Sequence, residues 1–237
     1  MEKIKILYWS DFICPFCYIG EQRMKNVMKE LNILDKFEFK LLSFELDPNA
    51  PKQRNLNVSQ ILAKKYNMTI EKANQTVEYI NQLGKAEGID FKYDKCLGGN
   101  TFNAHRLVKY IESKENYENT EKIINLLYDA YFTKNLLISD EKILIELGMK
   151  VGESKEDIEK LLNSEDFSRE VREDEEKGYL KRVHGVPYFI INGSEVINGA
   201  VSKEEMKEVL LNVINNVSIK NHPEGVLCDE NGCYIKK

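Results

Sequence analysis

Cysteine is the residue type in this chain whose spacing most directly suggests chemistry. Two of the five cysteines form the motif Cys14-Pro-Phe-Cys17, two more, Cys228 and Cys233, are separated by four residues, and Cys96 stands alone. Two close pairs and a singleton do not form an even disulfide framework. Such pairs are typical of redox chemistry or of metal binding.

The first pair lies where a strand passes into a helix. Residues 3–9 predict a strand, and residues from Pro15 to about Asn32 carry apolar positions at helical spacing. Cys14 is therefore expected at the N-cap and Cys17 on the same face, with Cα atoms about 5 to 6 Å apart, which suits a disulfide. Free N–H groups and the helix dipole favour a thiolate there, as in cysteines with pKa values of about 3.5 to 7.5. We predict that Cys14 is the nucleophile and that the more shielded Cys17 is the resolving thiol.

Two other interpretations of this motif stay open. A Cys-x-x-Cys pair can be half of a zinc site, although the helical body of the chain has no second pair at ribbon-like spacing. The two cysteines could also be inert core residues, but helix starts are normally partly exposed.

The surrounding elements predict a sheet interrupted by a block of helices. A second strand at Phe37 to Leu46 gives the chain a β-α-β start. Helical patterns then cover about 58–67, 69–87, 102–115, 119–133, 140–150, 155–163 and 165–181. After Gly185-Val186-Pro187 the pattern predicts strands at 188–192 and 195–198, a helix at 203–216 and an irregular extension beyond Ser218.

These patterns predict an α/β protein with a discontinuous domain. Residues 1–50 and 183–217 form its two halves, residues 51–182 form an inserted α-helical domain, and residues 218–237 form a C-terminal extension that carries the Cys-x4-Cys pair.

The composition limits the partners. The chain has 237 residues, 42% of them hydrophobic, and 34 Lys+Arg against 39 Asp+Glu give a net charge of -5. The apolar content excludes a disordered chain. The net negative charge argues against a basic surface that would bind nucleic acid or an anionic membrane. No stretch approaches the roughly 18 to 20 apolar residues that span a bilayer, and the N-terminus lacks a secretory h-region. We expect a cytoplasmic protein that is a monomer or a weak dimer.

The order of elements and three segments resemble a known family. The segments are Asp11-Phe-Ile-Cys-Pro-Phe-Cys-Tyr-Ile-Gly20, Asn100-Thr-Phe-Asn-Ala-His-Arg106 and His184-Gly-Val-Pro-Tyr-Phe-Ile-Ile-Asn-Gly193. Over residues 3–216 the chain resembles the thioredoxin fold in its DsbA-like branch, and within that branch the FrnE-type dithiol-disulfide oxidoreductases. The C-terminal Cys-x4-Cys is similar to an extension found in that subgroup.

The resemblance implies roles for residues far apart in the chain. An X-Pro bond is trans by default, but the family proline that matches Pro187 is cis and faces the redox pair. The backbone of Val186 would then pair with an extended substrate segment, beside Phe16, which stands where the family commonly has tryptophan. No metal or organic cofactor is implied. Because phenylalanine cannot stabilise a thiolate as the histidine of DsbA can, we expect a less oxidising couple.

Other side chains are candidates for tuning the pair. The resemblance brings the helix start with His105 and Arg106 near the site, where either could stabilise a thiolate; a partly buried polar pair is the alternative. Glu45, in the apolar second strand, is a candidate proton acceptor for Cys17. Asp11 is expected to cap or contact the loop, without a role in proton transfer.

The remaining cysteines have several interpretations. Cys96 could form a regulatory or mixed disulfide, although a free buried thiol is the preferred interpretation. Cys228 and Cys233 could exchange electrons with the first pair, form a structural disulfide, or bind zinc together with His222.

The leading hypothesis is a thiol-disulfide oxidoreductase, acting as an oxidase, reductase or isomerase. Cys14 would exchange with cysteines of protein substrates or with small thiols, and Cys17 would resolve the mixed disulfide. One alternative is a glutathione-dependent transferase or isomerase, because kappa-class glutathione transferases and 2-hydroxychromene-2-carboxylate isomerase share this inserted architecture but typically carry serine at the first active position. The other is a non-catalytic module in which the cysteine pairs bind metal.

Overall fold

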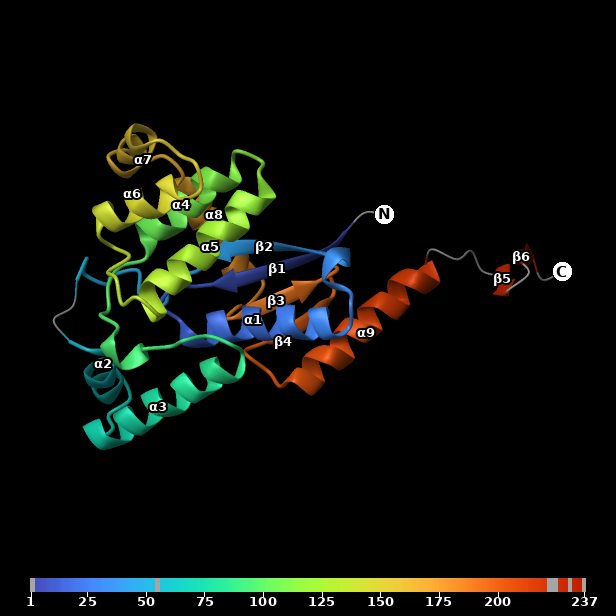
Figure 1. Cartoon of the computed structure of the whole chain (residues 1–237), viewed down its shortest axis with the longest axis horizontal. Coiled ribbons are helices and arrows are strands. Elements are labelled where there is room, and N and C mark those ends of the chain that lie inside the picture. Colours follow the sequence, from blue (N-terminus) through green and yellow to red (C-terminus); the bar gives the residue numbers. More distant parts are fainter. Residues whose placement is uncertain (1–2, 54–55, 221–225, 230–231, 236–237) are drawn as a thin grey trace.

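The computed structural model describes residues 3–53, 56–220, 226–229 and 232–235. In this part of the chain, helices flank a four-stranded mixed sheet, as the α/β prediction requires (Figure 1). The strands of this sheet are β1 (Ile4–Ser10), β2 (Phe37–Ser43), β3 (Tyr188–Ile191) and β4 (Glu195–Asn198). The helices are α1 (Pro15–Glu30), α2 (Val58–Lys65), α3 (Ile70–Ala86), α4 (Phe102–Glu112), α5 (Tyr117–Phe132), α6 (Glu141–Met149), α7 (Lys155–Leu162), α8 (Ser168–Leu180) and α9 (Lys203–Lys220), with short 3-10 turns η1 (Leu34–Lys36) and η2 (Tyr93–Lys95).

Strand order determines which loops meet. The strands lie in the order β2-β1-β3-β4, with β1 parallel to β2 and antiparallel to β3. In the β1–β3 register, Trp9 faces Tyr188. The residues that follow β1 and those that precede β3 therefore come together at the same edge of the sheet, although almost the whole helical part of the chain separates them in sequence.

The two faces of the sheet pack against different helices. Side chains alternate along a strand, so Ile6 and Tyr8 of β1 join the large core that includes residues of α1 and α9. Trp9 points to the opposite face, into a smaller cluster with Leu42. Gly178 of α8 approaches so closely there that a Cβ would lie 2.9 Å from the Trp9 ring nitrogen. The sheet is thus covered on both faces, as its apolar strands require.

Helices α4 to α8 gather beside the carboxyl ends of β1 and β2, whereas α2 and α3 lie on the other side of α1 (Figure 1). Helix α4 occupies a central position, because it packs against α5, α6, α7 and α8. In the part of the chain that the structure describes, no helix is both long and apolar enough to cross a membrane.

The structure corrects two expected boundaries. Strand β2 ends at Ser43 rather than at Leu46, because the backbone N–H groups of Glu45 and Leu46 bind carboxylates instead of a neighbouring strand. The irregular extension expected beyond Ser218 is wrong in part. Helix α9 continues to Lys220, since its apolar positions repeat at helical spacing as far as Val217. A hairpin follows, with strands β5 (Val226–Asp229) and β6 (Gly232–Ile235).

Candidate active site

Cys14 is the N-cap of α1, as its sequence context predicted. Its backbone is extended (φ -88°, ψ 111°), Pro15 follows at the first helical position, and the N–H of Cys17 binds the Cys14 carbonyl at 3.1 Å. No side chain caps this helix start. The first-turn N–H groups and the positive end of the helix dipole therefore face the Cys14 position, and the first turn carries no acidic residue.

The loop before β3 lies against this sulfur. The Val186–Pro187 bond is cis, in agreement with the family resemblance. The Cys14 Sγ lies 3.6 Å from the Val186 carbonyl oxygen. Two further contacts fix the loop: the Pro187 carbonyl accepts a hydrogen bond from Gly199 at 2.8 Å, and Gly20 of α1 leaves room for the proline ring, since a Cβ there would lie 3.1 Å from its Cγ.

The two cysteines differ in access. Cys14 is 5% exposed, whereas Cys17 is completely buried. Burial raises the pKa of Cys17 well above that of an exposed thiol, and the neighbouring Cys14 sulfur raises it further. The Ser10 hydroxyl and the backbone N–H of Asp11 oppose this effect, because they donate hydrogen bonds to the charged form. Cys17 is therefore a thiol that needs a proton acceptor before it can attack.

Ser10 belongs to a buried pair of hydroxyls. Its Oγ lies 2.5 Å from the hydroxyl of Tyr128 on α5, and both residues are buried completely. Burial, followed by the proximity of Cys17, raises the pKa of Tyr128 well above that of an exposed tyrosine. Tyr128 also stacks on Tyr18, with ring centroids 4.6 Å apart. The hydroxyl pair links the end of β1, directly before the redox motif, to helix α5.

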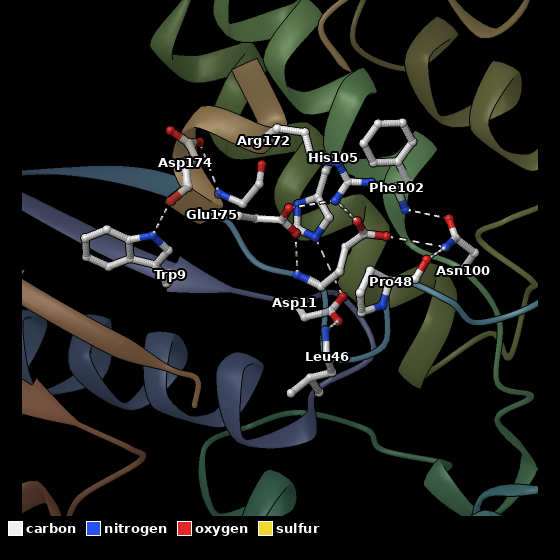
Figure 2. A network of polar contacts seen from close by, with 12 residues as sticks. Trp9, Asp11, Leu46, Pro48, Asn100, Phe102, His105, Arg172, Asp174 and Glu175 are labelled. Carbon is white, nitrogen blue, oxygen red and sulfur yellow. Dashed lines mark hydrogen bonds and ion pairs between the residues drawn. The ribbon is translucent and has the colours of Figure 1, made fainter. Parts of the chain in front are cut away.

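Asp11 and His105 form a second buried pair behind the motif (Figure 2). The Asp11 carbonyl accepts a hydrogen bond from the Cys14 N–H at 3.1 Å, and its side-chain Oδ2 accepts one from the Leu46 N–H at 2.7 Å. The other oxygen, Oδ1, lies 3.7 Å from the His105 Nε2, beyond hydrogen-bond distance. The His105 ring packs 4.8 Å from that of Phe12, so α4 reaches the motif as the sequence resemblance implied.

Arg106 does not share this position. Its guanidinium binds the backbone carbonyls of Leu161, Ser164 and Asp166 at 2.6 to 2.9 Å, where it closes the end of α7 and the following turn. The expected tuning of a thiolate by Arg106 is therefore not supported: its donors are engaged in holding helices together.

Glu45 also departs from its expected role. Its buried carboxylate binds Arg172 of α8 at 2.5 Å and Asn100 at 3.3 Å. Burial raises its pKa, and the Arg172 guanidinium opposes this effect. Both carboxylate oxygens are already bound, one by Asn100 and the other by Arg172. The interpretation as a proton acceptor for Cys17 thus loses its basis, and the residue instead connects α8 to the end of β2.

The expected substrate-facing side chain, Phe16, follows Pro15 in the first turn of α1 and is 40% exposed. Cys96 is a free, completely buried thiol whose sulfur lies 3.1 Å from the Tyr131 carbonyl oxygen, and burial raises its pKa to about 12. These observations agree with the interpretation of Cys96 as an unreactive core thiol.

For the C-terminal pair, Cys228 and Cys233, the structure gives the positions of the backbone. Cys228 of β5 and Cys233 of β6 lie directly opposite each other in the hairpin register. His222, the third residue of the zinc interpretation, lies outside the described residues. The three suggested roles of this pair stay predictions. Among the described residues, no three His, Cys, Asp or Glu side chains gather closely enough to hold a metal ion.

Sequence reasoning missed Ser10 and Tyr128, whereas Asp11 contacts the loop as expected, by accepting the Leu46 N–H. Ser10 lies close to the motif, so its position alone was a usable signal. Tyr128 lies 118 residues from Ser10 in the chain. No spacing in the sequence indicates that contact, because it depends on how α5 docks against the end of β1.

A thioredoxin-like sheet with a helix-capping cysteine and a cis-proline loop defines a class of proteins, the thioredoxin-fold oxidoreductases. The family described as "DSBA-like thioredoxin domain" matches residues 5–211 of this chain. The chain therefore belongs to the DsbA-like family.

Solved structures agree with this assignment. A probable DsbA oxidoreductase from Streptomyces coelicolor is 25% identical and has a TM-score of 0.83, over 99% of this chain and 100% of that one. A 2-hydroxychromene-2-carboxylate isomerase is 12% identical with a TM-score of 0.65, over 92% and 100% of the two chains. The cytosolic disulfide reductase DsbM from Pseudomonas aeruginosa with GSH is also 12% identical, with a TM-score of 0.60 over 89% and 99%. The last two likenesses concern the fold.

Proposed function

We propose that the protein is a thiol-disulfide oxidoreductase in which Cys14 attacks and Cys17 resolves. The observation that carries this proposal is the position of the Cys14 sulfur, at an uncapped helix N-terminus and 3.6 Å from the Val186 carbonyl of a cis-proline loop. A helix N-terminus favours the thiolate, which is the attacking species in disulfide exchange.

The proposed reaction needs no cofactor. The Cys14 thiolate attacks a substrate disulfide, forms a mixed disulfide and releases one substrate thiolate. Cys17 then loses its proton and attacks the Cys14 sulfur, which closes the Cys14–Cys17 disulfide and releases the second substrate thiolate. Two electrons pass to the substrate, and a dithiol donor restores the reduced pair. In the opposite direction, the same steps oxidise a substrate dithiol.

Substrate binding would use the loop before β3. The Val186 carbonyl is positioned to accept a hydrogen bond from an extended peptide whose disulfide approaches Cys14, and the exposed ring of Phe16 offers an apolar contact beside it. Both features favour cysteine-containing polypeptides, although small thiols could reach the same sulfur. The cytosolic location named for DsbM supports a cytoplasmic site of action for this chain.

The assay is reduction of insulin disulfides with dithiothreitol as electron donor. We expect Cys14→Ser to remove the protein-dependent rate, and Cys96→Ser, the same atomic change at a buried cysteine outside the site, to retain it. Full activity of Cys14→Ser would overturn the assignment of the nucleophile, and equal losses in both variants would show that the serine substitutions act through the fold.

A glutathione-dependent transferase or isomerase is the second candidate, because the fold is shared with 2-hydroxychromene-2-carboxylate isomerase. Such a reaction needs one thiolate-binding residue at position 14 and has no use for a resolving thiol. Cys17→Ser separates the two functions: it abolishes turnover of disulfides if Cys17 resolves, and it leaves a glutathione conjugation or isomerisation rate unchanged.

A further inference from the structure

Unsatisfied polar atoms concentrate behind the redox motif. Among the described residues, four buried side-chain atoms lack a hydrogen-bond partner, namely Asp11 Oδ1, His105 Nδ1, His105 Nε2 and Ser43 Oγ. Three of them belong to the Asp11–His105 pair, and both side chains are fully enclosed. A buried polar group without a partner costs about 1 to 3 kcal/mol, so its occurrence calls for a reason.

The pair is coupled to the cysteines through one residue. Asp11 accepts the Cys14 N–H at its carbonyl, and its own N–H stabilises negative charge on Cys17. Its carboxylate, in turn, faces His105 (Figure 2). A change in charge at the sulfurs therefore acts on the imidazole across the buried interior, where electrostatic interactions are stronger than in water.

The other charged groups around His105 are already committed. Glu45, beyond the end of β2, acts electrostatically on His105 but is paired with Arg172 of α8. Glu175 of α8 accepts a second bond from that same arginine. On the side of α5 the neighbours are aromatic. Phe12 contacts both His105 and Tyr128, and burial, with a smaller effect of Asp11, raises the pKa of Tyr131 well above its usual value, so Tyr131 stays neutral. Within α4, the cation one turn on, Lys109, binds Asp174. The Asp11 carboxylate is thus left with His105 as its nearest available proton carrier.

We propose that His105 takes up a proton when the Cys14–Cys17 disulfide is reduced and releases it on oxidation. The idea rests on the proposed dithiol function. Reduction by a dithiol donor places two electrons on the pair, leaving a thiolate at Cys14 and a protonated Cys17. The new negative charge arises next to Asp11, and protonation of His105 neutralises it. Two protons then accompany two electrons, where the cysteines alone would take one.

His105 acts here as a positioning residue, through charge, and does not touch the substrate. Asp11 would hold the imidazole and increase its attraction for the proton. Because reduction then takes up two protons rather than the one that the cysteines alone would take, the reduced protein is favoured more steeply as the pH falls. This dependence distinguishes a proton-linked pair from one that is merely structural.

Nuclear magnetic resonance of the intact protein tests the proposal. The chain has three histidines, so the imidazole signals are few, and His105→Gln assigns the one of interest. Titrating the wild-type protein with and without dithiothreitol should place the midpoint of the His105 signal about half a pH unit or more higher in the reduced form. Equal midpoints in the two forms, or no titration in either, would overturn the proposal.

Two variants complete the design. In the Cys14→Ser, Cys17→Ser double variant, dithiothreitol should leave the His105 midpoint unchanged, because no disulfide is available to reduce. Asp11→Asn should lower the midpoint in both redox forms. The cysteine Cβ signals separate the two proposals: if no disulfide forms between Cys14 and Cys17, the proposed function fails, whereas a disulfide that forms without moving the His105 midpoint rejects the proton linkage alone.

Discussion

Helix α4 carries two buried basic side chains one turn apart, each facing a carboxylate, and the two pairs are built differently. Lys109 binds Asp174 at 2.5 Å and the Leu41 carbonyl at 3.2 Å, while the Asp174 carboxylate also accepts from the Ser43 N–H and from Lys177. In the His105–Asp11 pair, the closest approach is 3.7 Å and three polar atoms have no partner.

The difference follows the location of each pair. The Lys109 pair joins α4 and α8 to the sheet, and the Trp9 ring nitrogen adds a bond to the Asp174 carbonyl at 2.8 Å. All of its charged groups have partners, so we expect it to act on stability. The His105 pair lies directly behind the cysteines and retains free proton-binding positions. Polar groups that are buried and incompletely satisfied are therefore found here at the site proposed for chemistry, as expected where function opposes stability.

The largest effect should come from breaking the satisfied pair. Lys109→Met retains much of the side-chain shape but leaves the buried Asp174 with only the more distant, exposed Lys177 as its cation. Removing one partner of a buried pair costs about 3 to 5 kcal/mol, and we expect a loss of that size in the free energy of unfolding measured with urea. Exchange activity per folded molecule should persist. A loss below about 1 kcal/mol would remove the contrast between the two pairs.

At alkaline pH, the free energy of unfolding of the reduced protein should depend on Cys17. Burial raises the pKa of Cys17, so its contribution to stability is fully present below the pKa of an unfolded thiol, about 8.5, and is lost as the pH rises toward the folded value. Above that pH, the free energy of unfolding of the reduced wild type should fall more steeply than that of reduced Cys17→Ala, by up to about 1.4 kcal/mol per pH unit. If the free energies of unfolding of the two proteins fall in parallel with pH, the pKa of Cys17 is not raised by burial.

Tyr128→Phe tests the pair of hydroxyls that Ser10 and Tyr128 form beside the redox motif. The change removes the partner of Ser10 and leaves a buried hydroxyl, so we expect a loss of about 1 to 2 kcal/mol in urea unfolding. When the Tyr128 hydroxyl donates to the Ser10 Oγ, the Ser10 proton is free to stabilise the charged form of Cys17, so loss of the Tyr128 hydroxyl should also slow the release of a mixed disulfide. Tyr131→Phe, a change of the same kind in a neighbouring buried tyrosine of α5, is the control and should leave that release rate unchanged.

The smallest effect on stability is expected for Asp11→Asn. The amide oxygen can still accept the Leu46 N–H, and the oxygen that is replaced has no hydrogen-bond partner. We expect the free energy of unfolding to change by about 1 kcal/mol or less. A loss as large as that of Lys109→Met would show that the Asp11 pair is structural after all.

Much of the fold could be predicted from the sequence. The period of the apolar residues gave the strands and helices nearly in place, because most of these elements bury one face. The end of β2 was missed, since it depends on carboxylates from distant helices that capture Glu45 and Leu46. The two strands after α9 were missed as well, although the sequence Asp-Glu-Asn-Gly between Cys228 and Cys233 had indicated a tight turn.

The parts of the site that depend on residues close together in the sequence could be predicted. The capping position of Cys14 follows from the strand-to-helix pattern, and the cis bond at Pro187 followed from the family resemblance. The surroundings were not predictable, because they depend on packing between helices. Arg106 and His105 are adjacent in the chain, yet one binds the end of α7 and the other faces Asp11. A helical wheel separates such neighbours only when the packing face is known.

The central claim, that Cys14 captures a substrate sulfur and Cys17 releases it, is tested most directly by trapping. Cys17→Ser incubated with a disulfide-bonded peptide should accumulate a covalent adduct at position 14, which dithiothreitol removes and mass spectrometry locates. Cys14→Ser under the same conditions should accumulate none. An adduct on Cys17 in the second variant, or no adduct in the first, would contradict this account.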